Sequence, residues 1–318
     1  MRNVFVTGGA GYLGRAVLAW AARESPDTAF TIFSRDEGKH EHTRRVYPRH
    51  RYVLGDIKDY DRLEMAMAGH DTVIHAAAMK YVPQGEQNVS EAVSVNVEGS
   101  RNVALAAIRN RVNRVVGIST DKACQPVNVY GMTKLLMERL FQEADGWSDT
   151  NFNLTRYGNV VSSTGSVIPL FQRQAKEGYV TLTNPSMTRF WLSVDDAVQL
   201  LDQALREPRG GTVLIPRLKS LSMREVAWAA AAVAVGPDRA NDLDYQTIGT
   251  RFGEKLHEDL LGQVEMNYAE SIDANLMRMH VVTEGIVDNH VQAPYTSERP
   301  DREMTATEMQ EMIIQADD

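Results

Sequence analysis

The sequence has few of the features that would place a protein outside the cell, in a membrane or on a nucleic acid. A single cysteine among 318 residues excludes an internal disulfide and suits a reducing cytoplasm. No apolar run approaches the ~20 residues that a membrane-spanning helix needs, and the first residues enter a predicted strand without room for a signal peptide. A net charge of -8 argues against a nucleic-acid-binding surface, although a small basic pocket remains compatible with it. We therefore expect a soluble, cytoplasmic protein that binds neither membranes nor nucleic acids.

What the sequence does contain is a regular alternation of short apolar runs with helical patterns. Hydrophobic residues make up 43% and charged residues 24%, as in ordinary globular proteins. The alternation predicts an α/β fold with a Rossmann-like, doubly wound parallel sheet. The predicted strands are residues 4–7, 30–33, 51–54, 72–74, 115–118 and 154–157. After residue 160 the periodicity is less regular, which indicates that residues 161–318 are mainly a smaller, discontinuous α/β substrate-binding region with segments returning to the first domain.

A glycine-rich turn follows the first predicted strand and opens a helix. Gly8, Gly11 and Gly14 are spaced three residues apart, with Tyr12 and Leu13 between the last two. Gly8 permits a tight turn, Gly11 lets a pyrophosphate approach the backbone, and Gly14 lets the helix pack close to the sheet. Because a strand precedes and a helix follows, the motif predicts a dinucleotide site in a domain of residues 1–160.

The residues after the second strand bear on which dinucleotide binds. Ser34 stands first after the strand, where a carboxylate often holds a ribose 2′-hydroxyl. Arg35 and Lys39 follow and suit a 2′-phosphate, so we favour NADP over NAD. Asp36 leaves NAD open, and a solvated charged turn is the alternative to any cofactor role.

Further residues suited to the cofactor follow the third and fourth strands. The Asp56 carboxylate can accept from an adenine amino group, and the small Ala76 and Ala77 let a dinucleotide lie against the backbone. Asn96 lies among apolar residues of a predicted helix over residues 90–110. It is either an exposed polar residue or a brace for the backbone beside the next helix.

The stretch from Ser119 to Lys134 carries the strongest indication of chemistry. Thr120, Asp121 and Lys122 follow the fifth strand, at the edge of the sheet where ligands bind. Tyr130 and Lys134 then share one face of a predicted helix. A phenol has a pKa of about 10, so Tyr130 can act as a base only where a cation such as Lys134 stabilises its phenolate. A chance Tyr-x-x-x-Lys spacing on a structural helix is the alternative.

Two clusters in the second half of the chain suit either a nucleotide or a packed seam between domains. Thr188 and Arg189 precede two aromatic residues, Phe190 and Trp191, and a guanidinium beside aromatics can hold a base and phosphates. The charged turn from Arg251 through Glu254 to Glu258 has the same ambiguity.

Together these features resemble the extended short-chain dehydrogenase/reductase superfamily, and within it the inverting UDP-N-acetylglucosamine 4,6-dehydratases. The resemblance spans Thr7 to Glu258, and Ser-Thr-Asp-Lys followed by Tyr-Gly-x-Thr-Lys is its most specific part. It implies a hydro-lyase with tightly bound NADP, a UDP-sugar substrate, no metal and a homo-oligomeric assembly. With this resemblance, Ile57 and Lys80 join the cofactor residues, and the substrate-binding candidates are the following: Lys80, Asn159, Ser166, Val167, Thr188, Arg189, Arg251 and Glu254.

The resemblance also implies a role for each catalytic residue. Tyr130 removes the proton of the C4 hydroxyl while Thr120 or Ser119 holds its oxygen. Lys122, with a pKa lowered by burial and nearby cations, takes the C5 proton, and a protonated Asp121 assists departure of the C6 hydroxyl. On a regular strand Asp121 and Lys122 point to opposite faces. These roles therefore require the chain to leave strand geometry there.

Three departures from the family pattern keep other functions open. Thr164 stands where the family usually has arginine or a similar polar residue, Phe252 where it has proline, and Cys124 where it has a small apolar residue. The alternatives are a nucleotide-sugar 4-epimerase, a 5,6-elimination without hydride return, and a non-catalytic NADP-binding module.

Overall fold

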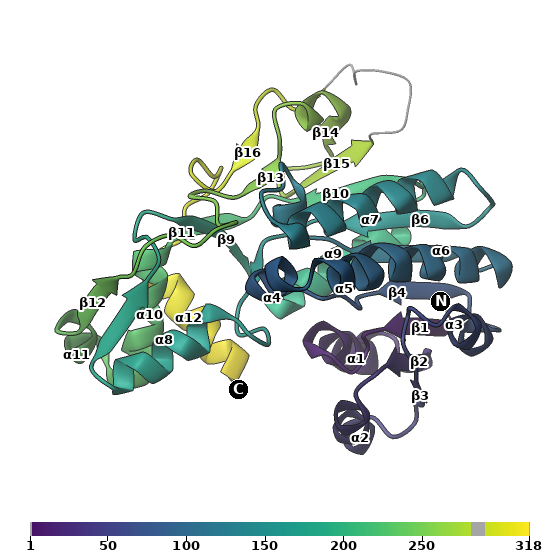
Figure 1. Ribbon diagram of the computed structural model, residues 1–318, viewed down its shortest axis with the longest axis horizontal. Helices are drawn as coiled ribbons and strands as arrows, with labels where there is room; N and C mark the ends of the chain where they lie inside the picture. The colour runs from purple at the N-terminus through teal and green to yellow at the C-terminus, as the bar shows by residue number, and fades with distance from the viewer. Residues whose placement is uncertain (1, 281–289, 318) are drawn as a thin grey trace.

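The computed structural model describes residues 2–280 and 290–317. A nine-stranded sheet forms the centre of the larger part, in the order β14-β15-β10-β6-β5-β4-β1-β2-β3 (Figure 1). In this sheet order, all neighbouring strands from β3 to β10 pair in parallel. Strand β15 pairs antiparallel with β10, and β14 pairs antiparallel with β15. Their bounds are β1 Asn3–Thr7, β2 Ala29–Ser34, β3 Arg51–Leu54, β4 Thr72–His75, β5 Arg114–Ile118, β6 Asn151–Thr155, β10 Thr212–Pro216, β14 Ala269–Ser271 and β15 Leu276–His280. The predicted Rossmann-like sheet is confirmed.

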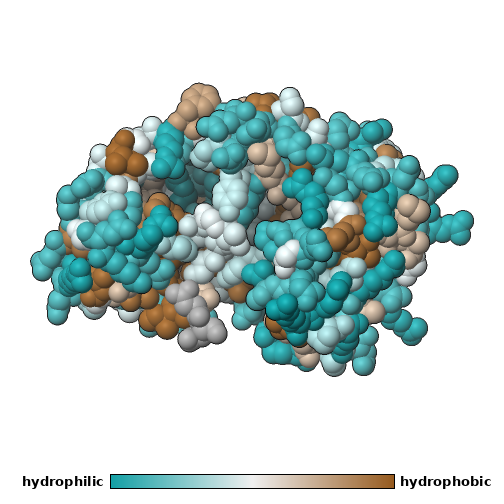
Figure 2. Space-filling model, turned by 60° about the horizontal axis from the view of Figure 1, so that its bottom comes forward, coloured by the Kyte–Doolittle hydropathy of each residue, from teal (hydrophilic) through white to brown (hydrophobic). Residues whose placement is uncertain are grey.

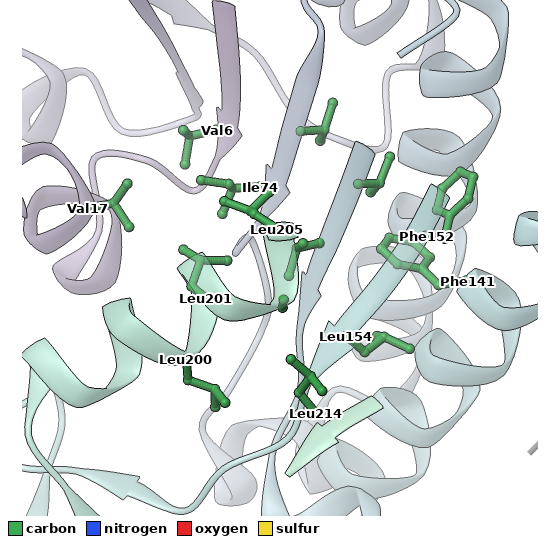
Figure 3. Packing of buried hydrophobic residues seen from close by; sticks show 14 of the residues in the cluster. Val6, Val17, Ile74, Phe141, Phe152, Leu154, Leu200, Leu201, Leu205 and Leu214 are labelled. Atoms are coloured by element: carbon green, nitrogen blue, oxygen red, sulfur yellow. The ribbon is translucent and has the colours of Figure 1, made fainter. Parts of the chain in front are cut away.

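Two sets of helices cover this sheet, one containing α3, α6 and α7 and the other α1 and α9 (Figure 1). Figure 3 shows Val17 of α1 and Leu201 of α9 pointing toward Ile74 of β4. Phe141 of α7 lies beside Phe152 of β6, with ring centroids 5.5 Å apart. The bounds are α1 Tyr12–Glu24, α2 Glu37–Val46, α3 Tyr60–Met67, α4 Val82–Gln87, α5 Val89–Val93, α6 Gly99–Arg109, α7 Val129–Asp145 and α9 Val194–Arg206.

A second hydrophobic cluster lies in the smaller part of the molecule, at the left of Figure 1. It is built around α10, whose alanines let α8 and α12 pack closely against it. The elements of this part are β7 Asn159–Val160, α8 Val167–Lys176, β8 Tyr179–Leu182, β9 Thr188–Leu192, β11 Lys219–Ser222, α10 Met223–Val235, α11 Pro237–Asn241, β12 Asp244–Thr247 and α12 Ala306–Asp317. The pair β13 Asp259–Leu261 and β16 Tyr295–Thr296 packs against the main cluster instead. Since α9, β10, β14 and β15 belong to the main sheet and its cover, the second half of the chain supplies both parts.

Two predicted elements differ from the structure. The sixth strand was expected at residues 154–157, but β6 begins at Asn151 and ends at Thr155. The start was missed because the polar Asn153 interrupts the apolar run. In the folded protein this buried amide donates to the carbonyls of Ala204 and Glu207 and accepts from the N–H of Thr212. The helix expected over residues 90–110 is α5 and α6 joined by a π-helical turn, Ser94–Glu98.

The face in Figure 2 is mostly hydrophilic, with hydrophobic residues in small groups. No helix in the described part of the chain is long and apolar enough to cross a bilayer.

Candidate active site

The glycine-rich turn between β1 and α1 forms a close-packed cradle. Gly8 has φ +68°, and a Cβ there would lie 2.8 Å from the backbone nitrogen of Ala77. At Gly14 a Cβ would lie 2.1 Å from the carbonyl oxygen of Gly9, so only glycine lets α1 approach the turn. Gly11 is the N-cap of α1 and makes no side-chain hydrogen bond to the first N–H groups of the helix. The helix N-terminus is thus presented by backbone alone, which fits the pyrophosphate of a dinucleotide.

Polar groups converge where β2 and β3 end. Ser34 Oγ and His40 Nε2 are 2.6 Å apart, and Arg35 Nη1 lies 3.3 Å from Asp56 Oδ2. Asp36 caps α2 by accepting from the N–H of Lys39 at 2.9 Å. The side chains of Arg35 and Lys39 remain 60% and 54% exposed, so both cations face solvent beside the N-terminus of α2. Ile57 is buried against Gly99, below this group.

Asn96 braces the backbone beside α7, one of the two roles that its sequence position allowed. It is 1% exposed. Its Oδ1 accepts from the N–H of Met79 at 2.8 Å, and its Nδ2 donates to the Met79 carbonyl and to Thr133 Oγ1. The π-turn places this amide inside the helix bundle, as π-turns often do near functional sites. Lys80 follows Met79, and its ammonium lies 5.8 Å from the centre of the Tyr81 ring.

The chain turns immediately after β5, as the proposed roles of Asp121 and Lys122 require. Asp121–Ala123 form a 3₁₀ turn capped by Thr120. Thr120 Oγ1 donates to Asp121 Oδ1 at 2.9 Å, and Lys122 Nζ donates to the same oxygen at 3.0 Å. A Cβ at Gly131 would lie 2.1 Å from the Lys122 carbonyl oxygen, so α7 packs directly on this turn.

The Tyr130 hydroxyl joins this turn through a hydrogen bond with Thr120. Burial raises the pKa of Tyr130 to about 12, although the Lys122 charge and the Thr120 hydrogen bond lower it. Lys134, expected to be the cation beside the phenol, instead donates to Met137 Sδ at 3.0 Å. Its side chain extends along α7, and burial lowers its pKa to about 8, with Glu138 opposing the shift. In this structure Lys122 is the cation that acts on Tyr130.

The sequence predicts a lowered pKa for Lys122, and this prediction is wrong in direction. Burial alone lowers it, but the carboxylates of Asp121 and Glu258 outweigh burial and raise the pKa above its ordinary range. The sequence places Glu258 at the end of a charged turn but does not predict that it approaches Lys122. Glu258 is 3% exposed and places Oε1 3.6 Å from Lys122 Nζ. The only available signal was an acidic residue next to the apolar β13, because contact across such a long sequence separation leaves no local pattern.

The predicted substrate residues other than Lys80, Thr188 and Arg189 fall into three groups. Asn159 lies in the catalytic cluster, where its Oδ1 accepts from Lys122 Nζ at 3.4 Å. Ser166 caps α8 and Val167 is the first residue of that helix. Arg251 and Glu254 form a turn in which Glu254 Oε2 accepts from the N–H of Arg251 at 3.0 Å.

Thr188 and Arg189 support the segment that carries Glu258. Thr188 Oγ1 is hydrogen-bonded to His257 Nδ1 at 2.8 Å and to Ser297 Oγ at 2.7 Å. Arg189 donates to the carbonyls of Thr188, Leu256 and Lys255. These polar groups are occupied within the chain, which corresponds to the packed-seam alternative for this cluster.

A second buried ionic cluster lies beside the first. Arg156 donates two hydrogen bonds to Glu138, at 3.0 and 2.6 Å, and two to Glu265, at 2.8 and 2.9 Å. Ser119 Oγ donates to Glu138 Oε1 at 2.5 Å, so its hydroxyl proton is already used. Of the two hydroxyls considered, Thr120 is therefore the one that bonds Tyr130. Cys124 Sγ donates to Glu265 Oε2 at 3.2 Å, and burial raises the pKa of its thiol.

Comparison with known proteins agrees with this fold. Residues 4–280 match the family described as polysaccharide biosynthesis protein. The chain belongs to this family. A member from Campylobacter jejuni, UDP-N-acetylglucosamine 4,6-dehydratase (inverting), is 40% identical over 267 residues, which cover 82% of this chain and 77% of that protein. UDP-glucose 4-epimerase of Rickettsia canadensis is 39% identical over 280 residues, covering 85% and 81%.

Solved structures give the same result for the fold. Pen from Bacillus thuringiensis is 31% identical with a TM-score of 0.90, and the match covers 99% of this chain and 98% of that one. The dTDP-glucose 4,6-dehydratase DesIV of Streptomyces venezuelae, solved with NAD bound, is 23% identical with a TM-score of 0.71, covering 80% and 86%. The resemblance seen in the sequence is confirmed, and a nicotinamide dinucleotide is the cofactor class that the family and the glycine cradle support.

Proposed function

We propose that this protein is an NADP-dependent 4,6-dehydratase that converts UDP-N-acetylglucosamine to a UDP-4-keto-6-deoxyhexose with inversion at C5. The observation that carries the proposal is the convergence of Tyr130, Thr120, Asp121 and Lys122 on one turn at the end of β5. The 40% identity to a dehydratase of that specificity supports the substrate. In this proposal residues 1–160 bind the cofactor and residues 161–318 mainly bind the sugar nucleotide.

When bound, the nicotinamide supplies the hydride acceptor for oxidation at C4 and the hydride donor for reduction at C6. Tyr130 removes the C4 hydroxyl proton, assisted by the Lys122 charge and the Thr120 hydrogen bond, which both lower its pKa. The resulting C4 ketone makes the C5 hydrogen acidic, and Lys122 as a neutral amine takes that proton. Asp121 as an acid gives a proton to the C6 hydroxyl, which leaves as water.

Thr120 closes the proton balance of this scheme. The reaction releases one water, whose oxygen comes from C6 and whose added proton must come ultimately from the C4 hydroxyl. Thr120 is hydrogen-bonded both to Tyr130, which takes that proton, and to Asp121 Oδ1, which supplies the proton to the leaving group. A relay through the Thr120 hydroxyl can therefore restore both groups after each turnover.

The preference for NADP over NAD rests on Ser34, Arg35 and Lys39 at the N-terminus of α2. A helix N-terminus and two exposed cations suit a 2′-phosphate, while Asp36 is occupied as the α2 cap. We expect Arg35→Ala to weaken NADP binding about tenfold, since one charge-assisted contact is lost, and to leave NAD binding nearly unchanged. Isothermal titration with both cofactors measures this, and equal losses for the two would contradict the preference.

A 4-epimerase is the second candidate, because a 39%-identical relative carries that name. An epimerase needs Tyr130 and the cofactor but has no use for an acid and an amine at C5 and C6. Mass spectrometry after incubation with UDP-N-acetylglucosamine distinguishes the two. A product lighter by one water supports dehydration, whereas an isomer of unchanged mass supports epimerisation.

A further inference from the structure

Glu258 is a buried carboxyl that the scheme above does not use. It follows the turn at residues 251–254 and reaches the catalytic cluster from the second half of the chain, with its backbone N–H bonded to Ser297 Oγ at 2.9 Å. Its Oε1 lies 3.6 Å from Lys122 Nζ. Its Oε2 has no hydrogen-bond partner among the residues that the structure describes. A carboxyl this buried with an unsatisfied oxygen is costly unless it has a function.

Three cations and three carboxylates meet around Glu258, but its nearest cation, Lys122, is shared with Asp121. Lys122 faces two carboxylates, with Asp121 Oδ1 at 3.0 Å and Glu258 Oε1 at 3.6 Å. The other cations are farther away, with Arg189 Nε at 3.9 Å and Lys255 Nζ at 4.0 Å. Both are held elsewhere, since Arg189 donates to backbone carbonyls and Lys255 donates to the Cys124 carbonyl at 2.6 Å and to Asp259 at 3.2 Å.

The sharing of Lys122 between two carboxylates bears on a difficulty in the proposed chemistry. An ammonium cannot take the C5 proton, yet Asp121 and Glu258 favour the ammonium form of Lys122 and raise its pKa. Burial and the Asp121 charge also raise the pKa of Glu258, although Lys122 opposes the shift. Moving a proton from the amine to this carboxyl removes both charges from a largely buried site.

We propose that Glu258 is the proton partner of Lys122: the proton passes from Lys122 Nζ to Glu258 Oε1, leaving a neutral amine and a neutral carboxylic acid. The amine then takes the C5 proton of the 4-keto sugar and later returns a proton to C5, while Glu258 keeps its proton until the product leaves. No proton is exchanged with solvent in the transfer between the two side chains. The inference rests on the proposed dehydratase function, and Glu258 acts through Lys122 as a positioning residue.

The test compares the pH dependence of C5 exchange in the wild type and Glu258→Gln. In heavy water, deuterium at C5 reports the proton taken by Lys122. Because the wild-type transfer is internal, we expect its exchange rate to vary little with pH near neutrality. In Glu258→Gln the Lys122 proton must leave to solvent, so the rate at pH 7 falls on the order of 10²-fold and recovers as the pH rises. Exposed Glu298→Gln is the matched control and should behave as the wild type.

The outcomes separate this inference from the function on which it rests. If the wild type neither releases water nor gains deuterium, the dehydratase proposal fails. If the wild type does both and Glu258→Gln shows the same rate and pH profile, only the role of Glu258 is contradicted. Glu258→Asp, which keeps a carboxyl, should retain the flat profile at a reduced rate.

A measurement on the wild type covers the case in which Glu258→Gln does not fold. Infrared difference spectra with ¹³C-labelled glutamate should show a protonated glutamate appearing when UDP-N-acetylglucosamine binds the holoenzyme. No gain of protonated glutamate would overturn the proposal.

Discussion

Two buried ionic clusters stand side by side at the carboxyl ends of β5 and β6, and they differ in how completely their hydrogen bonds are satisfied. In the Arg156 cluster, Arg156 is fully buried and paired with Glu138 and Glu265 through four hydrogen bonds, with a fifth to the Leu260 carbonyl. In the Lys122 cluster, Lys122 is 20% exposed, and one oxygen each of Asp121 and Glu258 has no hydrogen-bond partner among the residues that the structure describes.

This difference suits the Arg156 cluster to anchoring the fold and the Lys122 cluster to chemistry. The Arg156 cluster ties the 3₁₀ turn Glu265–Tyr268 to α7 and β6, which fixes the segment that brings Glu258 to the site. Its hydrogen-bonding groups are bonded within the chain, so it has no capacity left for a substrate. The Lys122 cluster keeps unsatisfied oxygens and a reachable ammonium, which are the properties that proton transfer needs.

Removing the phenol should produce the largest effect on the Lys122 cluster. We expect Tyr130→Phe to lower the turnover of UDP-N-acetylglucosamine by about 10²- to 10⁴-fold, because the base for the C4 hydroxyl is lost. Cofactor affinity and thermal stability should change little. Product formation by mass spectrometry measures the effect, with Tyr47→Phe, far from the site on the α2 side, as control. Near-normal turnover in Tyr130→Phe would remove the phenol from the mechanism.

Breaking the Arg156 cluster should instead affect folding. Arg156→Met leaves Glu138 and Glu265 without their buried cation, and we expect a loss of about 3–5 kcal/mol in the free energy of unfolding. The control is Arg45→Ala, which breaks an exposed pair with Glu41 and should cost about 1 kcal/mol or less. Urea denaturation measures both. Equal stabilities would mean that the Arg156 cluster is not an anchor.

Acid should weaken the anchor in a defined range. Burial raises the pKa of Glu265, but the charge and hydrogen bonds of Arg156 outweigh burial and lower it from 4.5 to about 2. A depressed pKa stabilises the fold above the unfolded value and loses that contribution as pH falls toward the folded value. The stability of the wild type should therefore decline between about pH 4.5 and pH 2 by roughly 2 kcal/mol from this group. Glu265→Gln should decline less in urea titrations over that range.

The sequence predicts the parts of this architecture that leave local patterns. The parallel strands β1 to β6 are short, largely apolar runs followed by glycine, small or polar residues, so this part of the sheet and the cradle at Gly8 could be read directly. The parallel β10, in the less regular second half, was not predicted. The turn at Asp121 and Lys122 and the neighbouring Tyr130 lie within one short stretch, which made their proximity predictable.

The missed features depend on contacts between distant segments. Arg156 and Glu258 are charged, and charged residues are usually exposed. The fold nevertheless buries both. Because Glu258 was not placed beside Lys122, the direction of the Lys122 pKa shift was predicted wrongly. Likewise, the spacing of Tyr130 and Lys134 gave a shared helix face but not the direction of the Lys134 side chain.

The most direct test of the central claim is C5 deuterium incorporation from heavy water into UDP-N-acetylglucosamine, compared between the wild type and Lys122→Ala. The account predicts a wild-type product that has lost one water and carries deuterium at C5, and neither change in Lys122→Ala at preserved cofactor affinity. Exposed Lys176→Ala serves as the matched control. Dehydration with C5 exchange at the wild-type rate in Lys122→Ala would contradict the account.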